Sequence, residues 1–77
     1  MKDESIADKI SALIAEEHQL YGRGPIGDHV RKRARAIEIE LDQCWDLLRQ
    51  RRAKREFGKN PDEATLRSPG TVQGYEG

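Results

Sequence analysis

Three acidic residues have the spacing of a metal-binding edge on a helix. Glu38, Asp42 and Asp46 recur at every fourth position, and carboxylates on one helix face can hold a metal ion. Di-metal helical bundles also supply Glu-x-x-His pairs, however, and the contiguous Glu-Glu-His at residues 16–18 lacks that spacing. We therefore interpret the acidic edge as a solvent-facing lattice of salt bridges, and we predict no metal site.

The two histidines and the single cysteine offer weaker chemistry. His18 and His29 flank a predicted turn, but with no third ligand in view they make a poor zinc site. Cys44 falls on a predicted apolar helix face, where a thiol is usually a small buried hydrophobic group and not a nucleophile. The glycines are too dispersed for a phosphate-binding loop. We predict no catalytic residue, no cofactor and no enzymatic activity.

A cluster of cations is the most conspicuous charged feature. It consists of Arg49, Arg51, Arg52, Lys54 and Arg55. On a helix these side chains form a basic collar, which could neutralise nucleic-acid phosphates or complement the helix dipole and contact acids of a protein partner. The collar lacks the interleaved aromatics of single-stranded nucleic-acid binders, and the net charge of the chain is zero. We favour a protein contact, with nucleic-acid binding as the alternative.

Apolar spacing predicts two helices that position these groups. The first covers about residues 5–21 and the second about residues 28–57. The apolar positions of the second helix are spaced 4, 3, 4, 3 and 4 residues apart, as in a coiled coil: Val30, Ala34, Ile37, Leu41, Cys44 and Leu48. Gly22 and Pro25 end the first helix and Gly58 ends the second. The short connection between the helices predicts an antiparallel hairpin.

The predicted fold class is therefore all-α, with a coiled-coil-like hairpin over residues 1–57 and a disordered, flexible tail over residues 58–77. The tail contains two prolines and four glycines and has no apolar periodicity. Its segment 60–63, Asn-Pro-Asp-Glu, could form one extra helical turn.

The short turn also suggests a register for the hairpin. It favours a pairing in which Ile6 lies opposite Leu41, although a shift by one heptad stays open. In this pairing the apolar faces of the two helices meet along a seam. Glu17 is the one charged residue of the first helix in that seam, and Arg31 and Arg33 lie close enough to form an ion pair with it.

The second helix is too long for the first to cover. At the standard rise the helices span roughly 45 and 25 Å, so the part beyond about Cys44 has no partner in the hairpin. Trp45, Leu47 and Leu48 lie there, and burying each typically stabilises a protein by about 1.5–3 kcal/mol. A second copy of the chain is the simplest cover, and the folded-back tail is the alternative. We predict that these three residues and the basic collar form the partner-binding surface.

Composition limits the class of protein. A chain of 77 residues, with 35% hydrophobic and 36% charged residues, forms one domain with a modest core. A single cysteine fits a reducing compartment, and no apolar stretch approaches the roughly 20 residues that cross a bilayer. Residues 1–21 hold two lysines against five acids, and residues 22–57 hold ten basic residues against six acids. Such opposite charges suit two segments that pair. We predict a cytoplasmic protein without membrane contact.

One sequence string resembles a known family. Residues 41–53, LDQCWDLLRQRRA, look like the signature of short, uncharacterised actinobacterial proteins that are classed as a domain of unknown function. Residues 16–18 and 60–64 resemble flanking segments of the same family. The resemblance implies an actinobacterial cytosolic protein, and it brings no activity or site residue with it.

Overall fold

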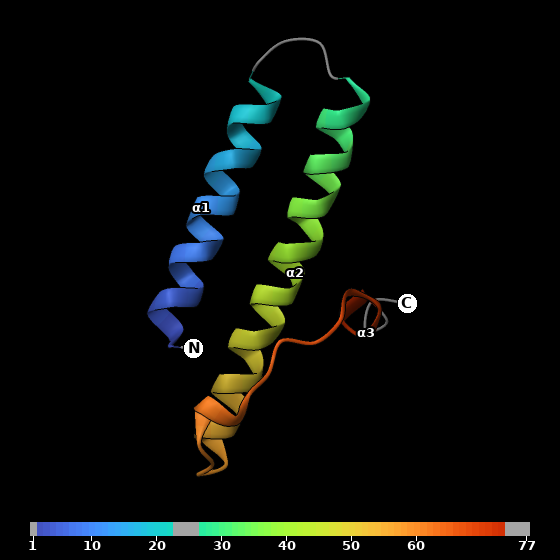
Figure 1. The fold of residues 1–77 in the computed structure, drawn as a ribbon. Coiled ribbons are helices and arrows are strands. Elements are labelled where there is room, and N and C mark those ends of the chain that lie inside the picture. The colour runs from blue at the N-terminus through green and yellow to red at the C-terminus, as the bar shows by residue number, and fades with distance from the viewer. Residues whose placement is uncertain (1, 23–26, 74–77) are drawn as a thin grey trace.

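A computed structural model describes residues 2–22 and 27–73. Helices α1 (Asp3–Tyr21) and α2 (Asp28–Glu56) lie side by side and antiparallel, and α2 continues well beyond the start of α1 (Figure 1). A 3-10 turn, η1 (Pro61–Glu63), and a short helix, α3 (Pro69–Gln73), follow. No strand occurs in the described ranges. The predicted all-α hairpin with a longer second helix is confirmed, while most of its predicted turn, residues 23–26, falls outside those ranges.

The helix ends agree with the prediction to within two residues. Helix α1 begins at Asp3 and not near Ser5, and the carbonyl of Lys2 accepts a hydrogen bond from the Ile6 N–H at 3.2 Å. The earlier start places the charge of Asp3 at the positive end of the helix dipole. Helix α2 ends at the predicted stop, because Gly58 has a φ of 71°, in the left-handed region that side chains other than glycine rarely adopt.

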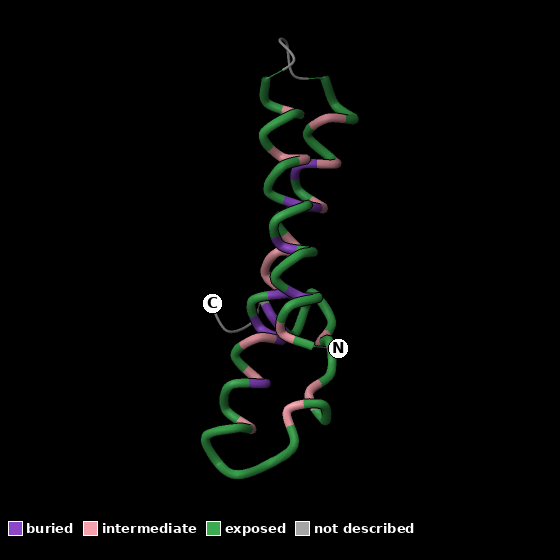
Figure 2. Tube along the Cα trace, turned by 90° about the vertical axis from the view of Figure 1, so that its left-hand side faces the viewer, coloured by how far each residue is buried: buried purple, intermediate pink, exposed green. Residues whose placement is uncertain are grey.

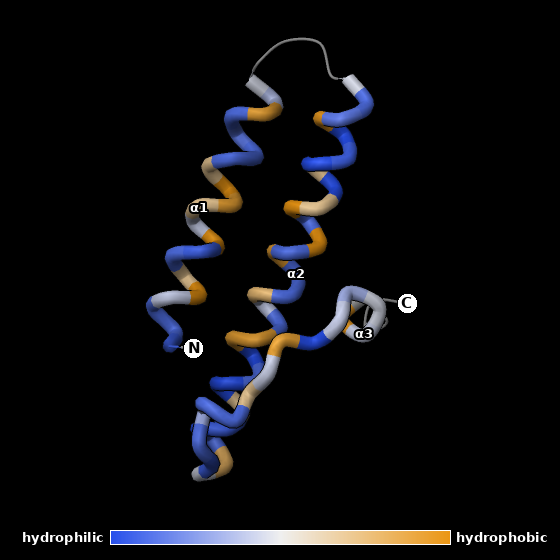
Figure 3. Tube along the Cα trace, viewed as in Figure 1, coloured by the Kyte–Doolittle hydropathy of each residue, from blue (hydrophilic) through white to orange (hydrophobic). Residues whose placement is uncertain are grey.

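The core lies along the contact between the two long helices (Figure 2). It consists of Ile6, Ile10, Leu13, Ile37, Cys44 and Leu47. Ile6 and Ile37 are completely buried. The apolar segments of both helices face each other over most of the length of α1 (Figure 3). This is the arrangement that the apolar spacing predicted.

The register differs from the favoured pairing. Asp3 forms ion pairs with Arg51 and Arg55, and Leu47 shares a core cluster with Ile6. The start of α1 therefore lies further along α2 than a pairing of Ile6 with Leu41 would place it. The heptad spacing from Val30 to Leu48 could not predict this register, because Leu47 is not one of the heptad positions. Leu47 widens the apolar face of α2 beyond them.

The ion pair beside the helix contact also involves a different acid from the one that the sequence predicted. Arg33 donates two hydrogen bonds to Glu16, at 2.5 and 2.7 Å, whereas the prediction assigned this role to Glu17. The Arg33–Glu16 pair lies at the edge of the contact, where both side chains keep access to water.

The tail packs against α2, which agrees with the alternative of a folded-back tail and not with the prediction that residues 58–77 are flexible throughout. Gln43 Nε2 donates to the carbonyl of Arg67 at 2.9 Å, and Gln50 Nε2 donates to the carbonyl of Thr65 at 2.8 Å. Val72 is buried, and Ala64 packs against the core. The predicted turn at residues 60–63 is confirmed as η1, and residues 74–77 lie outside the described ranges. Single apolar residues without periodicity give no signal from which such packing can be predicted.

None of the described helices combines the length and the apolar character that a membrane-spanning helix requires.

Candidate interaction surface

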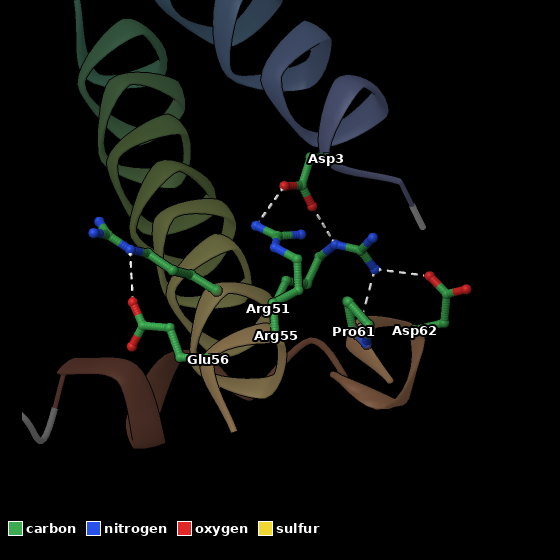
Figure 4. A network of polar contacts seen from close by, with 7 residues as sticks. Asp3, Arg51, Arg55, Glu56, Pro61 and Asp62 are labelled. Atoms are coloured by element: carbon green, nitrogen blue, oxygen red, sulfur yellow. Dashed lines mark hydrogen bonds and ion pairs between the residues drawn. The ribbon is translucent and has the colours of Figure 1, made fainter. Parts of the chain in front are cut away.

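Arg51 joins three segments of the chain at one point (Figure 4). Its Nε donates to Asp3 at the start of α1, and its Nη1 donates to Asp62 Oδ1 at 3.0 Å and to the Pro61 carbonyl at 3.2 Å. Arg55 Nη2 contacts the other carboxylate oxygen of Asp3 at 2.8 Å. Arg51 is only 6% exposed. It thus acts as a clamp that fixes the first turn of α1 and the start of the tail to α2.

These contacts change the acidity of the carboxylates. Hydrogen bonds from Arg55 and Arg51 lower the pKa of Asp3, and the hydrogen bonds from Arg33 lower the pKa of Glu16. The hydrogen bonds to Asp3 and Asp62 likewise raise the pKa of Arg51. Each shift favours the charged form of its group, so the ion pairs stabilise the fold while the carboxylates stay ionised.

We expect acid to weaken the fold through Asp3. The pKa of Asp3 is lower in the folded state than in the unfolded chain, where it lies near 4. Its contribution is therefore present above about pH 4 and is lost as the pH falls through the folded-state value. Urea unfolding at a series of pH values should show stability falling on acidification in the wild type and falling less in Asp3→Asn. Equal pH profiles for the two proteins would contradict this role.

The predicted collar divides into paired and unpaired cations. Arg51 and Arg55 bind Asp3, Lys54 Nζ lies 3.8 Å from Glu63, and Arg52 Nε lies 3.2 Å from Glu56. Within the described part of the chain, Arg49 has neither a hydrogen bond nor an ion pair. Four of the five cations therefore already have acidic partners.

The three predicted apolar contact residues also have different positions. Leu47 is buried in the core, and Leu48 is half-buried against it. The prediction that the part of α2 beyond Cys44 lacks any partner is therefore wrong for Leu47, because the shifted register covers it. Trp45 remains 48% exposed, and of the three it offers the most contact area to another molecule.

The acidic edge does not face solvent as one row. Glu38 is exposed and Asp42 is half-buried, but Asp46 is buried on the tail side. Asp46 accepts a hydrogen bond from Gln50 Nε2 at 2.8 Å and lies 3.4 Å from Arg67 Nε. A step of four residues advances 40° beyond a full helical turn, and this drift carries Asp46 round to the tail.

The remaining candidates for chemistry are Cys44, His18 and His29. Cys44 is buried, and this burial raises the pKa of its thiol, which keeps it protonated and unreactive. His18 and His29 are exposed. Among the described residues, no three His, Cys, Asp or Glu side chains converge on a point that could hold a metal ion.

An open groove of about 250 Å³ lies between the end of α2 and the tail. Phe57, 78% exposed, contributes its apolar wall. Two of its cations, Lys54 and Arg67, already pair with Glu63 and Asp46. Lys59, the third cation that lines the groove, has no ion pair within the described part of the chain, so the groove offers one unpaired positive charge to an anionic ligand.

Sequence reasoning missed the residues that hold the tail. Asp3 and Asp62 gave no signal as partners of Arg51, because they are 48 and 11 residues away from it in the chain. Gln43 and Gln50 bind main-chain carbonyls, which every segment offers equally. The extra turn at residues 60–63 was the one signal in the sequence, and it correctly located the point where the tail returns to α2.

Comparison with known proteins identifies relatives of the chain. A family model described as a protein of unknown function (DUF2630) matches residues 2–77. An uncharacterized protein of Mycobacterium tuberculosis and one of Mycobacterium bovis are each 47% identical over 79 residues, covering 97% of this chain and 91% of the relative. No solved structure matches the chain. The resemblance to short, uncharacterised actinobacterial proteins is confirmed.

Proposed function

We propose, for a chain that belongs to the DUF2630 family of proteins of unknown function, a role as a non-enzymatic protein-interaction module of the cytoplasm. It acts as a helical homo-oligomer or as a small subunit of a larger complex. The observation that carries the proposal is Trp45, which is about half exposed on a regular helix. Tryptophan is enriched at protein interfaces, and an exposed indole gains free energy when a partner removes it from water.

Further apolar exposure supports the same role. Ile14, Tyr21, Phe57 and Leu66 are also exposed in a chain whose hydrophobic residues make up only 35%. A protein with so few apolar residues keeps few for its own core, so contact with a partner would add stability. The buried thiol of Cys44 suits a reducing cytoplasm.

Nucleic-acid binding by the basic collar is the less favoured function. Phosphate binding needs cations that are free to replace counterions. Arg51 and Arg55 instead bind Asp3, and Lys54 and Arg52 lie beside Glu63 and Glu56. Phosphate contacts by Arg51 and Arg55 would therefore compete with their ion pairs to Asp3, which leaves Arg49 as the collar residue without an ion pair in the described chain.

We expect Trp45→Ala to weaken self-association by at least about 30-fold, the effect of removing a typical tryptophan hot spot. The wild type should show a mass above that of a monomer in sedimentation equilibrium, and the variant should require a higher concentration to reach it. Circular dichroism should show unchanged helicity, because Trp45 lies outside the buried core.

Phe57→Ala is the matched control, since Phe57 is more exposed than Trp45 but lies at the end of α2. It should associate nearly as the wild type does. A wild type that stays monomeric at about millimolar concentration would overturn self-association, and equal losses in the two variants would show that Trp45 is not the centre of the contact.

A further inference from the structure

A second heptad stripe runs along α2 beside the one that packs against α1. Its residues follow one another at intervals of 3, 4, 3, 4, 3 and 4, the spacing of a helix–helix contact. This outer stripe consists of Arg35, Glu38, Asp42, Trp45, Arg49, Arg52 and Glu56. All of its side chains are exposed except Asp42, which is half-buried. The described tail approaches α2 elsewhere, through Gln43, Asp46, Gln50 and Lys54, and leaves the outer stripe open.

The charges of the outer stripe have opposite signs on the two sides of Trp45. At each step outward from Trp45, an acid on one side corresponds to a base on the other. The three pairs are Asp42 with Arg49, Glu38 with Arg52, and Arg35 with Glu56. When the stripe is read backwards, every charge is therefore replaced by its opposite.

Such a pattern is complementary to itself in the antiparallel direction. If two copies of α2 cross at Trp45, each stripe residue of one copy lies opposite a stripe residue of the other copy. The two residue numbers of such a pair add up to 90 or 91. Glu38 then meets Arg52 of the other copy, and Asp42 meets Arg49. A two-fold axis repeats each contact, as closed homodimers require.

We propose that the partner of this protein is a second copy of the same chain, docked α2 against α2 in the antiparallel direction about a two-fold axis at Trp45. The inference rests on the proposed function and names the partner and the geometry. The two hairpins together form a four-helix arrangement, with the indoles at its centre and the charged pairs toward both ends.

The unpaired charges of the monomer support this geometry. Within the described chain, Arg35, Glu38, Asp42 and Arg49 have no ion pair or hydrogen bond. Arg52 pairs with Glu56 on the same helix, but both are well exposed, and such exposed pairs exchange partners at little cost.

A parallel pairing is disfavoured by the same residues. It would place Glu38 against Glu38 and Arg49 against Arg49, and like charges in contact oppose association. The centre of the stripe is apolar on its inner side, where Leu41 and Leu48 lie four residues before and three after Trp45 and are half-buried. The contact would thus have an apolar centre and a charged rim, as stable interfaces do.

Charge reversal in the full chain tests the pairing. Asp42→Arg places arginine opposite Arg49 at both symmetric sites, and Arg49→Asp places aspartate opposite Asp42. We expect either variant alone to dimerise at least about tenfold more weakly than the wild type. Mixing the two variants should restore a dimer that contains one chain of each, because both charge pairs are then complementary again. Asp8→Arg, an exposed charge reversal on α1, is the matched control and should dimerise as the wild type does.

The readout is the mass of each variant and of the mixture, with helicity checked by circular dichroism. Native mass spectrometry of a mixture in which one variant is isotopically labelled identifies the mixed dimer. Recovery of the mixed dimer supports the antiparallel pairing. A dimeric wild type whose Asp42→Arg variant dimerises equally well overturns the pairing and leaves self-association intact. A wild type that is monomeric at about millimolar concentration overturns the proposed self-association itself.

Discussion

We expect Ile37→Ala to destabilise the hairpin by about 2–5 kcal/mol, the usual effect of deleting a large aliphatic side chain from a packed core. Ile37 is completely buried between the helices, so the variant loses apolar burial and also leaves a cavity. Total stability in a domain of this size is of the same order. Thermal unfolding followed by circular dichroism should therefore show a largely unfolded chain at 25 °C.

Ile14→Ala provides the matched control for this loss. Ile14 belongs to the other long helix and is 39% exposed, so its truncation should change the free energy of unfolding far less. Similar unfolding curves for the two variants would show that the core does not lie at Ile37.

Arg51→Ala should detach the tail from the hairpin. The substitution leaves Asp3 and Asp62 without their buried cation and the Pro61 carbonyl without its donor. We expect the amides of residues 60–72 to exchange with solvent much faster than in the wild type and the melting temperature to fall. Hydrogen exchange followed by mass spectrometry measures the amide exchange rates of both the tail and the first turn of α1.

The neighbouring Arg52→Ala separates this effect from a general loss of positive charge. Arg52 is exposed and pairs only with Glu56 on the same helix in the described structure, a contact of small expected effect. The tail amides of the Arg52→Ala variant should exchange with solvent at the wild-type rate. Identical exchange profiles for Arg51→Ala and Arg52→Ala would contradict the clamp.

The hairpin could be predicted from local patterns, whereas the clamp could not. The heptad spacing from Val30 to Leu48 and the left-handed Gly58 depend on residues close in sequence, so the helix ends agree to within two residues. The register depends on which arginine reaches Asp3, and several arginines lie along α2. Three-dimensional packing decides which arginine contacts Asp3, and this contact produces no periodic pattern in the sequence.

The partner-binding prediction shows the same division. Trp45 retains the exposure expected of a contact residue, while Arg51 and Leu47 are buried inside the monomer. Residue type alone could not separate them, because arginine and leucine occur both in interfaces and in clamps or cores. Whether each of these residues is buried or exposed depends on how α1 and the tail pack against α2.

The fluorescence of Trp45 across a dilution series tests self-association through α2 most directly. Trp45 is the single tryptophan, so its emission reports on this surface alone. Diluting the protein from about 1 mM to about 10 nM covers binding free energies of roughly 4 to 11 kcal/mol. We expect the emission maximum to move to longer wavelength on dilution, with the same midpoint as the fall in mass to the 8.8 kDa of one chain. An emission maximum that stays constant while the mass remains 8.8 kDa at every concentration would contradict self-association through Trp45.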